Sequence, residues 1–380
     1  MQSSLLRLRL GVVILTAVLL TSVALGSDVE KTLASHSGLR GRVKQCIEQT
    51  LYPAQGDVAE RTYTSTSIYS PDGSLLQSRT SQSPEVDYVT TYTYDADGQL
   101  LRITSSTSTP DAEQFSATYS YDDKGRLVSI SSGGTVTTSY EYDEYGQKRR
   151  VQHYPVRDAE PNAAVSGVQW ENSDLHFGSP SGGTITTIYD QRDRPAEAKV
   201  SDANERVTLR IVRAYDEQGR LRGDKLIPED MESAIPDELG ALMNDAQKKA
   251  VAKFLARSFG SGESAYKYDA QGRVIEKRVT GGLLGNEVTM IRYNDGGDVS
   301  AEESNRTPTP EMNAAFGVDE AGNMAPVSKS KGLGPSRTDV RYAYEYDAQG
   351  NWTQKTVSVR SESDGEFNVS MTTHRTLTYY

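Results

Sequence analysis

The sequence predicts an all-β protein built as one long antiparallel sheet of consecutive β-hairpins, with one helical insertion. The main reason is a short motif, Asp-x-x-Gly, that recurs along most of the 380 residues. Each copy lies between two runs in which apolar or aromatic residues alternate with polar ones, which is the period of a strand. These runs are rich in Thr, Ser, Val and Tyr, residues that suit a half-buried sheet surface.

The recurring unit is Tyr-x-Tyr-Asp-x-x-Gly, most clearly at 266–272. Asp at the first position of a type I turn accepts hydrogen bonds from the backbone, and Gly at the fourth adopts the left-handed conformation that ends the turn with a bulge. The turn residues are Asp95, Gly98, Asp122, Gly125, Asp143, Gly146, Asp216, Gly219, Asp269, Gly272, Asn294, Gly297, Asp347 and Gly350. Ser70–Gly73 is a variant with proline, and Asp190–Asp193 is a copy that has lost its glycine.

Tyrosines precede the turns at a spacing of two, so they are expected to share one face of the sheet and to stack across neighbouring strands. The candidate ligand face consists of Tyr92, Tyr94, Tyr119, Tyr121, Tyr140, Tyr142, Tyr266, Tyr268, Tyr344 and Tyr346. After the turns, alternation predicts the apolar pairs Leu101/Ile103 and Val128/Ile130. The chain has 22 Tyr and 6 Phe, which suits a face only partly withdrawn from water.

Composition narrows the function classes. With 41 Lys+Arg against 52 Asp+Glu the net charge is −11, which argues against nucleic acid and anionic membrane surfaces as partners. The single cysteine, Cys46, excludes a disulfide framework. We expect Cys46 to be a small buried residue of the first strand, the alternatives being a reactive thiol or an intermolecular disulfide.

Residues 1–26 have the pattern of a secretory signal peptide. Arg7 and Arg9 precede an apolar run at 10–20, and Ala24-Leu25-Gly26 forms a cleavage site. The alternative is an uncleaved amino-terminal anchor. The protein is therefore expected to be exported, to the periplasm, the cell surface or the medium, with no membrane span in the mature chain.

After a polar lead-in at 27–41, one repeat domain is expected over 42–380, with strands at 41–51 and 61–69 at its start. Insertions interrupt it at 155–183 and 305–337, both predicted as loops, and at 228–262. The last contains a predicted helix at 236–259, bent near Asn244, whose apolar face either covers part of the sheet or binds a partner. The final strand at 375–380 is expected to close the sheet or to cap its edge.

The search for chemistry predicts no catalytic, cofactor-binding or metal-binding residues, so the protein is expected not to be an enzyme. The histidines His36, His153, His176 and His374 are scattered. The segment 95–98 resembles part of a calcium loop but lacks the acidic ligand at loop position twelve. The segment 347–353 resembles a turn of sugar-enzyme propellers without its leading serine. A glycan hydrolase has only the abundance of carboxylates in its favour.

Arginine follows the turn glycine in 125–127, 219–221 and 272–274, and Leu or Val comes next. The repeated Tyr-Asp-x-x-Gly-Arg-Leu/Val resembles the RHS/YD-repeat family over roughly 60–380. The resemblance implies export or surface association and a strip of antiparallel sheet that spirals into a shell. Larger members enclose a carboxy-terminal toxin, and some repeats are associated with carbohydrate binding.

This chain has fewer repeats than the large members, lacks their Asp-Pro core-terminating motif, and shows no further domain after Tyr380. We therefore expect it to be too short to close a shell by itself, and its sheet to be curled or open. The favoured function is a non-catalytic binding or structural module of the cell envelope, with a glycan or another envelope protein as partner. The alternative is a shell fragment that wraps or presents a partner or toxin polypeptide.

Overall fold

The computed structural model describes residues 38–380 apart from 84–85, 110–113, 156–166, 179–181, 233–234, 236–239, 242, 259–261, 282–284, 309–314, 319–323, 329–334 and 362–364. The predicted signal peptide, most of the polar lead-in and His36 lie outside the described residues.

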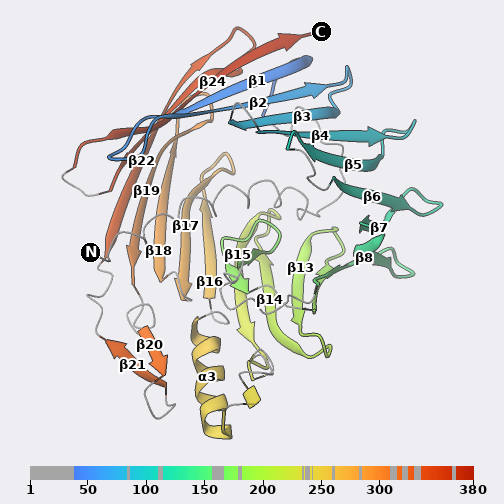
Figure 1. Cartoon of the computed structure of the whole chain (residues 1–380), viewed down its shortest axis with the longest axis vertical. Helices are drawn as coiled ribbons and strands as arrows, with labels where there is room; N and C mark the ends of the chain where they lie inside the picture. Colours follow the sequence, from blue (N-terminus) through green and yellow to red (C-terminus); the bar gives the residue numbers. More distant parts are fainter. Residues whose placement is uncertain are drawn as a thin grey trace.

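Within the described residues, twenty strands form one antiparallel sheet (Figure 1). They are β1 (Val43–Tyr52), β2 (Arg61–Tyr69), β3 (Leu75–Ser83), β4 (Val86–Tyr94), β5 (Leu100–Thr107), β6 (Phe115–Tyr121), β7 (Leu127–Ser132), β8 (Thr135–Tyr142), β9 (Lys148–His153), β12 (Thr184–Tyr189), β13 (Pro195–Ser201), β14 (Val207–Tyr215), β15 (Leu221–Pro228), β16 (Gly262–Tyr268), β17 (Val274–Gly281), β18 (Asn286–Tyr293), β19 (Val299–Thr307), β22 (Ser336–Tyr346), β23 (Trp352–Arg360) and β24 (Asn368–Tyr379). Each strand pairs with the next one in this order.

The sheet closes on itself because β24 also pairs with β1, with Leu377 opposite Cys46 and Arg375 opposite Glu48. The sheet is therefore closed, which is more specific than the expected curled or open sheet, and the expectation that the chain is too short to close is wrong. Several strands carry no turn motif, so counting motifs underestimates the length of the sheet. Closure pairs both edges that an open sheet would leave exposed. Of the two roles expected for the final strand, it closes the sheet.

The repeated turns have the hydrogen bonds that their residues favour. The Gly272 N–H donates to the Asp269 carbonyl (3.1 Å), and the Asp269 N–H donates to the Arg273 carbonyl (2.9 Å). Gly272 has a φ of 81°, which glycine adopts without steric cost. In the copy without glycine, Asp193 takes the same role with a φ of 56°.

A β-bulge follows most of these turns. In the first complete copy Tyr94 is opposite Leu100, but Thr93 is opposite Arg102, so Leu101 is the extra residue. Leu100 is 5% exposed and Leu101 is 37% exposed. Leu100, and not Leu101 as alternation predicts, therefore shares the buried face with Ile103. An equivalent bulge in the next hairpin buries Leu127 in place of Val128.

We call the side of the sheet that bears the repeat tyrosines the tyrosine face, and the other side the opposite face. One row of the tyrosine face, in register across six strands, is Tyr140, Arg150, Thr187, Ala198, Ile211 and Leu226. All six residues are buried. Cys46 is buried with Val43 and Tyr69, which confirms the expectation for this residue.

The two ends of the closed sheet differ. Consecutive antiparallel strands connect alternately at one end and at the other, so all the repeated turns lie at one end, the turn rim. The three insertions lie at the other end, the insertion rim. Figure 1 accordingly draws α3 (Asp245–Ser258) at the same end as the hairpin of β20 (Ala315–Val318) and β21 (Met324–Ser328).

The insertions contain more regular structure than predicted. Where loops were expected, 155–183 contains the hairpin of β10 (Gly167–Gln169) and β11 (His176–Gly178), and 305–337 contains β20 and β21. The predicted helix is present as α3. Asn244 caps α3, because Asn244 and Gln247 exchange two backbone-to-side-chain hydrogen bonds of 2.9 Å. Residues 240–241 before it are also helical, and 236–239 of the predicted helix lie outside the described residues. Among the described side chains, Val251 and Ala252 of α3 pack on Ile235 of the same insertion.

Candidate functional site

The second tyrosine of most repeats makes a hydrogen bond to the preceding hairpin. Its hydroxyl donates to the backbone carbonyl of the residue two positions after the preceding turn. The pairs, with O···O distances from 2.6 to 3.0 Å, are Tyr94–Leu75, Tyr121–Leu100, Tyr142–Leu127, Tyr215–Pro195, Tyr268–Leu221 and Tyr293–Val274. In the last copy it is Tyr344 that bonds to Val299 (3.0 Å).

The arginine after the turn makes a second contact between successive hairpins. Arg220 forms an ion pair with Asp216 of its own turn (2.7 Å), and its guanidinium lies 4.5 Å from the ring centroid of Tyr268 in the next copy. Arg126 does the same with Asp122 and Tyr142. Cation–π and hydrogen-bond contacts thus join each hairpin to the next, which explains why Arg belongs to the motif. We call this series the tyrosine ladder.

Most of the candidate ligand tyrosines therefore make contacts with other residues of the sheet. Tyr92, Tyr94, Tyr119, Tyr121, Tyr140 and Tyr142 come together in one cluster around buried leucines and isoleucines, whereas Tyr266, Tyr268, Tyr344 and Tyr346 lie elsewhere on the ring. Burial raises the pKa of Tyr119 to about 12, so its hydroxyl stays protonated. The rings of Tyr344 and Tyr346 stack on each other at 5.9 Å. These contacts are those of structural residues.

A tight turn from the first insertion docks on the tyrosine face. The Ser173 N–H donates to the Trp170 carbonyl (2.8 Å), and the central residues Glu171 and Asn172 have φ values of 45° and 58°. Two consecutive positive φ values are the mark of a type I′ turn. Trp170 is 2% exposed, and its indole N–H donates to Thr187 Oγ1 (3.0 Å). We call residues 170–173 the docked turn.

Buried charges hold the docked turn in place. Glu171 pairs with Arg150 at 2.6 Å, with side chains 4% and 2% exposed, and Tyr189 donates to Glu171 (3.3 Å). The Arg213 guanidinium lies 4.5 Å from the Trp170 ring and pairs with Asp224 (2.6 Å). Burial raises the pKa of Glu171, although the positive charge of Arg150 acts in the opposite direction. Such pairs are costly to break, because one partner is left charged and buried.

Sequence reasoning missed this site because it interpreted 155–183 as a loop. Neither Glu171 nor Asn172 is glycine, and Asn172 alone is of a type that readily adopts a positive φ, so the sequence gives only a weak signal of a left-handed turn. The available signal was Trp170, one of only two tryptophans in the chain, in a segment otherwise rich in polar residues.

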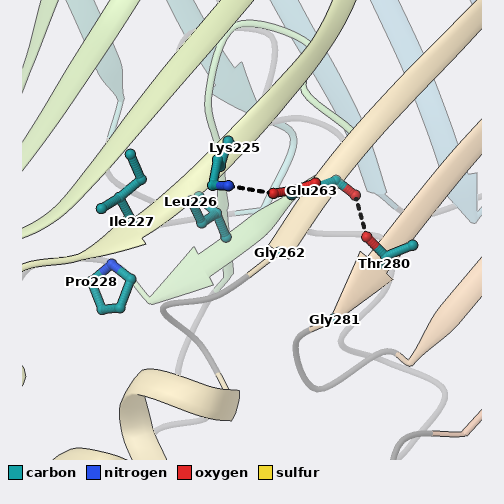
Figure 2. A pocket seen from close by; sticks show the side chains of 8 residues that line it. All are labelled: Lys225, Leu226, Ile227, Pro228, Gly262, Glu263, Thr280 and Gly281. Atoms are coloured by element: carbon teal, nitrogen blue, oxygen red, sulfur yellow. Dashed lines mark hydrogen bonds and ion pairs between the residues drawn. The ribbon is translucent and has the colours of Figure 1, made fainter.

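A hollow of about 410 Å³ lies between β15 and β16 (Figure 2). These strands pair only at Lys225–Glu263 and Leu226–Gly262. Lys225 and Glu263 form an ion pair at 2.6 Å, both more than half exposed, and the remaining side chains are mainly apolar. No set of polar groups converges on this hollow. Within the described ranges, no cluster of three or more His, Cys, Asp or Glu could hold a metal ion.

The RHS Repeat family model matches residues 118–155, a stretch with two turn motifs. Among solved structures, the chain resembles that of TcdB2-TccC3-Cdc42, with 12% identity, a TM-score of 0.34 and coverage of 84% of this chain and 15% of that one. It also resembles a porin-like protein from Bacteroides uniformis ATCC 8492 (11% identity, TM-score 0.30, covering 90% and 99%) and one from Bacteroides vulgatus ATCC 8482 (11%, 0.21, 72% and 95%).

No curated protein matches the chain. Among the helices in the described part of the chain, none is both long enough and apolar enough to cross a membrane. The chain carries an RHS repeat at 118–155, and its resemblance to the RHS/YD-repeat family is confirmed.

Proposed function

We propose that this protein is a non-catalytic shell module whose closed sheet holds a polypeptide segment against the tyrosine face. The docked turn carries the proposal. Trp170 and Glu171 come from an insertion, yet both side chains are almost fully buried, against β9 and β12, which flank the insertion, and against Arg213 of β14. In this chain the held segment is its own, and in a larger assembly a partner segment would take such a place.

The chemistry of the face suits polypeptide better than sugar. A glycan site needs exposed aromatic rings beside free polar groups. Here the hydroxyls of Tyr121 and Tyr268 are engaged by backbone carbonyls, and an arginine covers one side of the Tyr268 ring. By contrast, the socket of Arg150, Arg213 and Thr187 binds an indole and a carboxylate, which are protein side chains. We therefore rank carbohydrate binding below polypeptide binding.

We also propose that the protein acts outside the cytoplasm, on the strength of the pattern at 1–26. The mature chain would begin at Ser27. Intact mass and amino-terminal sequencing of the protein from the extracytoplasmic fraction would test both statements, and a chain that keeps Met1 in the cytoplasm would contradict them.

The shell proposal is tested by cleaving the chain on both sides of the docked turn. Protease sites placed at 160 and 180 would release a peptide that contains the docked turn. We expect this peptide to remain bound to the ring during gel filtration. In Trp170→Ala we expect it to dissociate at least about tenfold faster, because the indole contributes most of the buried apolar area.

A matched control is Tyr145→Ala, since Tyr145 is 87% exposed at the turn rim; the peptide should stay bound in this variant. Immediate loss of the peptide from the unsubstituted ring, with the ring still folded by circular dichroism, would contradict the proposal. A neutral oligosaccharide that binds the uncut protein and is lost in Tyr268→Phe would favour the carbohydrate function instead.

A further inference from the structure

The opposite face carries a group of charged side chains on β18, β19, β22 and β23. Ile291 is buried on the tyrosine face, so its neighbours Met290 and Arg292 point to the opposite face. Two rows run across the four strands in register. They are Arg292, Ala301, Arg341 and Ser358, and Met290, Glu303, Asp339 and Arg360. Together with Arg337 and Phe367, the residues of these rows other than Ser358 line a hollow of about 130 Å³, which we call the arginine hollow.

The carboxylates of the arginine hollow already have cationic partners. Asp339 is buried and accepts hydrogen bonds from Arg337 (2.9 Å) and Arg360 (3.0 Å). Glu303 pairs with Arg337 (3.2 Å) and accepts a hydrogen bond from Asn305 (3.2 Å). Arginine binds carboxylates in a fixed planar geometry, so this row shows the same contact that the hollow could offer to a ligand.

The row that contains Ala301 has two arginines for which the described residues provide no ion pair. Arg292 and Arg341 lie in register on either side of Ala301, whose small side chain leaves space between them. Both are exposed, and among the described residues neither has an Asp or Glu oxygen within 4.0 Å. The Arg341 guanidinium lies 3.9 Å from the ring centroid of Phe367, which also contacts Arg360 at 4.6 Å. Phe367 therefore helps to orient Arg341 toward the hollow.

We infer that the arginine hollow is a binding site for a carboxylate group, which Arg292 and Arg341 hold from two sides above Ala301. A chain with a net charge of −11 otherwise repels anions, so two adjacent arginines without a carboxylate partner among the described residues stand out. A singly charged carboxylate fits better than a phosphate, because the nearby Glu303 and Asp339 repel a dianion more strongly. The carboxylate could belong to an acidic polypeptide or to an acidic sugar. This site is on the face that the shell proposal does not use.

The test is direct binding to the full mature chain at low ionic strength. Two labelled probes, a hexaglutamate peptide and tri-galacturonate, separate the two sources, and hexaglutamine is the neutral control. We expect at least one acidic probe to bind, and the affinity to fall at least about tenfold in Arg292→Ala and in Arg341→Ala. In Ala301→Glu a carboxylate from the floor would occupy the site, so binding should be lost without loss of either arginine.

The matched control is Arg102→Ala. Arg102 is another exposed arginine on the opposite face, opposite Thr93 and outside the arginine hollow, and its removal should leave the affinity unchanged. All variants alter exposed or half-buried side chains, and circular dichroism checks that they fold. The proposal is overturned if neither acidic probe binds, if Arg102→Ala weakens binding as much as Arg292→Ala does, or if equimolar phosphate displaces the probes.

Discussion

In most copies the tyrosine that precedes the turn joins two hairpins, because its hydroxyl bonds to the strand before it in the sheet. Removing one hydroxyl tests the tyrosine ladder. Tyr268→Phe deletes the 2.6 Å hydrogen bond to the Leu221 carbonyl and keeps the ring under Arg220. We expect the free energy of unfolding to fall by about 0.5–1.5 kcal/mol, measured by urea denaturation. Tyr145→Phe, at an 87% exposed position, should have no effect; an equal loss in both variants would refute the ladder.

The turn aspartates predict how stability depends on pH. The backbone N–H of Arg126 holds the pKa of Asp122 below its usual range, and the pKa of Asp190, Asp216, Asp269 and Asp347 is lowered as well. A carboxyl whose pKa is lower in the folded state stabilises the fold above its ordinary pKa of about 3.9. That stabilisation is lost as the pH falls further.

We therefore expect the melting temperature to fall steeply below about pH 4. Asn294 shows that an amide can hold the first position of the turn, since it accepts the Asp298 N–H at 2.9 Å. Asp122→Asn should melt slightly lower than the unsubstituted protein at pH 7, because the ion pair with Arg126 is lost, and the difference should shrink by pH 3. A difference that stays constant or grows toward low pH would contradict this assignment.

At the residue scale, the sequence predicts contacts between residues that are close together in the chain. The turn aspartates and glycines follow from backbone chemistry within four residues. The partners of Tyr268 and Arg220 do not, because they lie across a strand boundary whose register depends on the bulge. Glu171 was out of reach for another reason: its partner Arg150 comes from a different strand, and nothing local marks a buried carboxylate.

At the scale of elements, the hairpins were predictable and their exact faces were not. The alternation of apolar residues places Leu101 beside Ile103, but one extra residue after the turn moves Leu100 into that place. The small hairpins of the insertions were missed because β10, β11, β20 and β21 are at most five residues long. The helix was found from its spacing; its described part has helical residues at 240–241 and then α3, which begins after Asn244.

The backbones of β15 and β16 approach each other very closely at Gly223. A Cβ on Gly223 would lie 2.0 Å from the Ser264 carbonyl oxygen, so Gly223→Ala must push the two strands apart. We expect a loss of at least about 1–3 kcal/mol in the free energy of unfolding. Hydrogen exchange should also become faster in β15 and β16.

Gly240→Ala is the control for this prediction, because the nearest atoms to its Cβ would be 3.9 Å away. It should be close to neutral. If Gly223→Ala were as stable as Gly240→Ala, the two strands would not be in the tight contact that we describe.

At the scale of the whole molecule, one buried asparagine supports the closure of the sheet beside the pairing of β1 with β24. Asn351 is 1% exposed and bonds to the Arg40 N–H (2.6 Å), the Arg40 carbonyl (2.9 Å) and the Tyr379 hydroxyl (2.8 Å). It therefore joins the last repeated turn to the residues that flank β1 and β24. In other copies Arg, Gln, Asp or Ser occupies this position, so asparagine is found there only at the seam.

We expect Asn351→Ala to cost about 1–3 kcal/mol, since it leaves backbone groups of Arg40 without partners. Hydrogen exchange monitored by mass spectrometry should speed up in β1 and β24 more than in β14. Gln271→Ala, at an exposed position of an equivalent turn, should change neither. Uniformly faster exchange around the ring would show that the seam is not a separate weak point.

Closure itself could not be predicted from the motif. A repeat reports how neighbouring hairpins pair, but whether the last strand meets the first depends on strand number, tilt and twist summed over the whole ring. The pair of Glu48 and Arg375, 2.6 Å apart across the seam, becomes visible only when the two ends are placed side by side.

The separation of the two rims has a practical consequence for protein engineering. The repeated turns lie at the turn rim and the three insertions at the insertion rim. A foreign sequence grafted at the insertion rim therefore leaves the repeated turns unchanged. A graft between β20 and β21 would leave every repeated turn intact, whereas the same graft at Asp269–Gly272 would remove a turn that links successive repeats. We therefore expect the insertion rim to accept inserted sequences and the turn rim not to accept them.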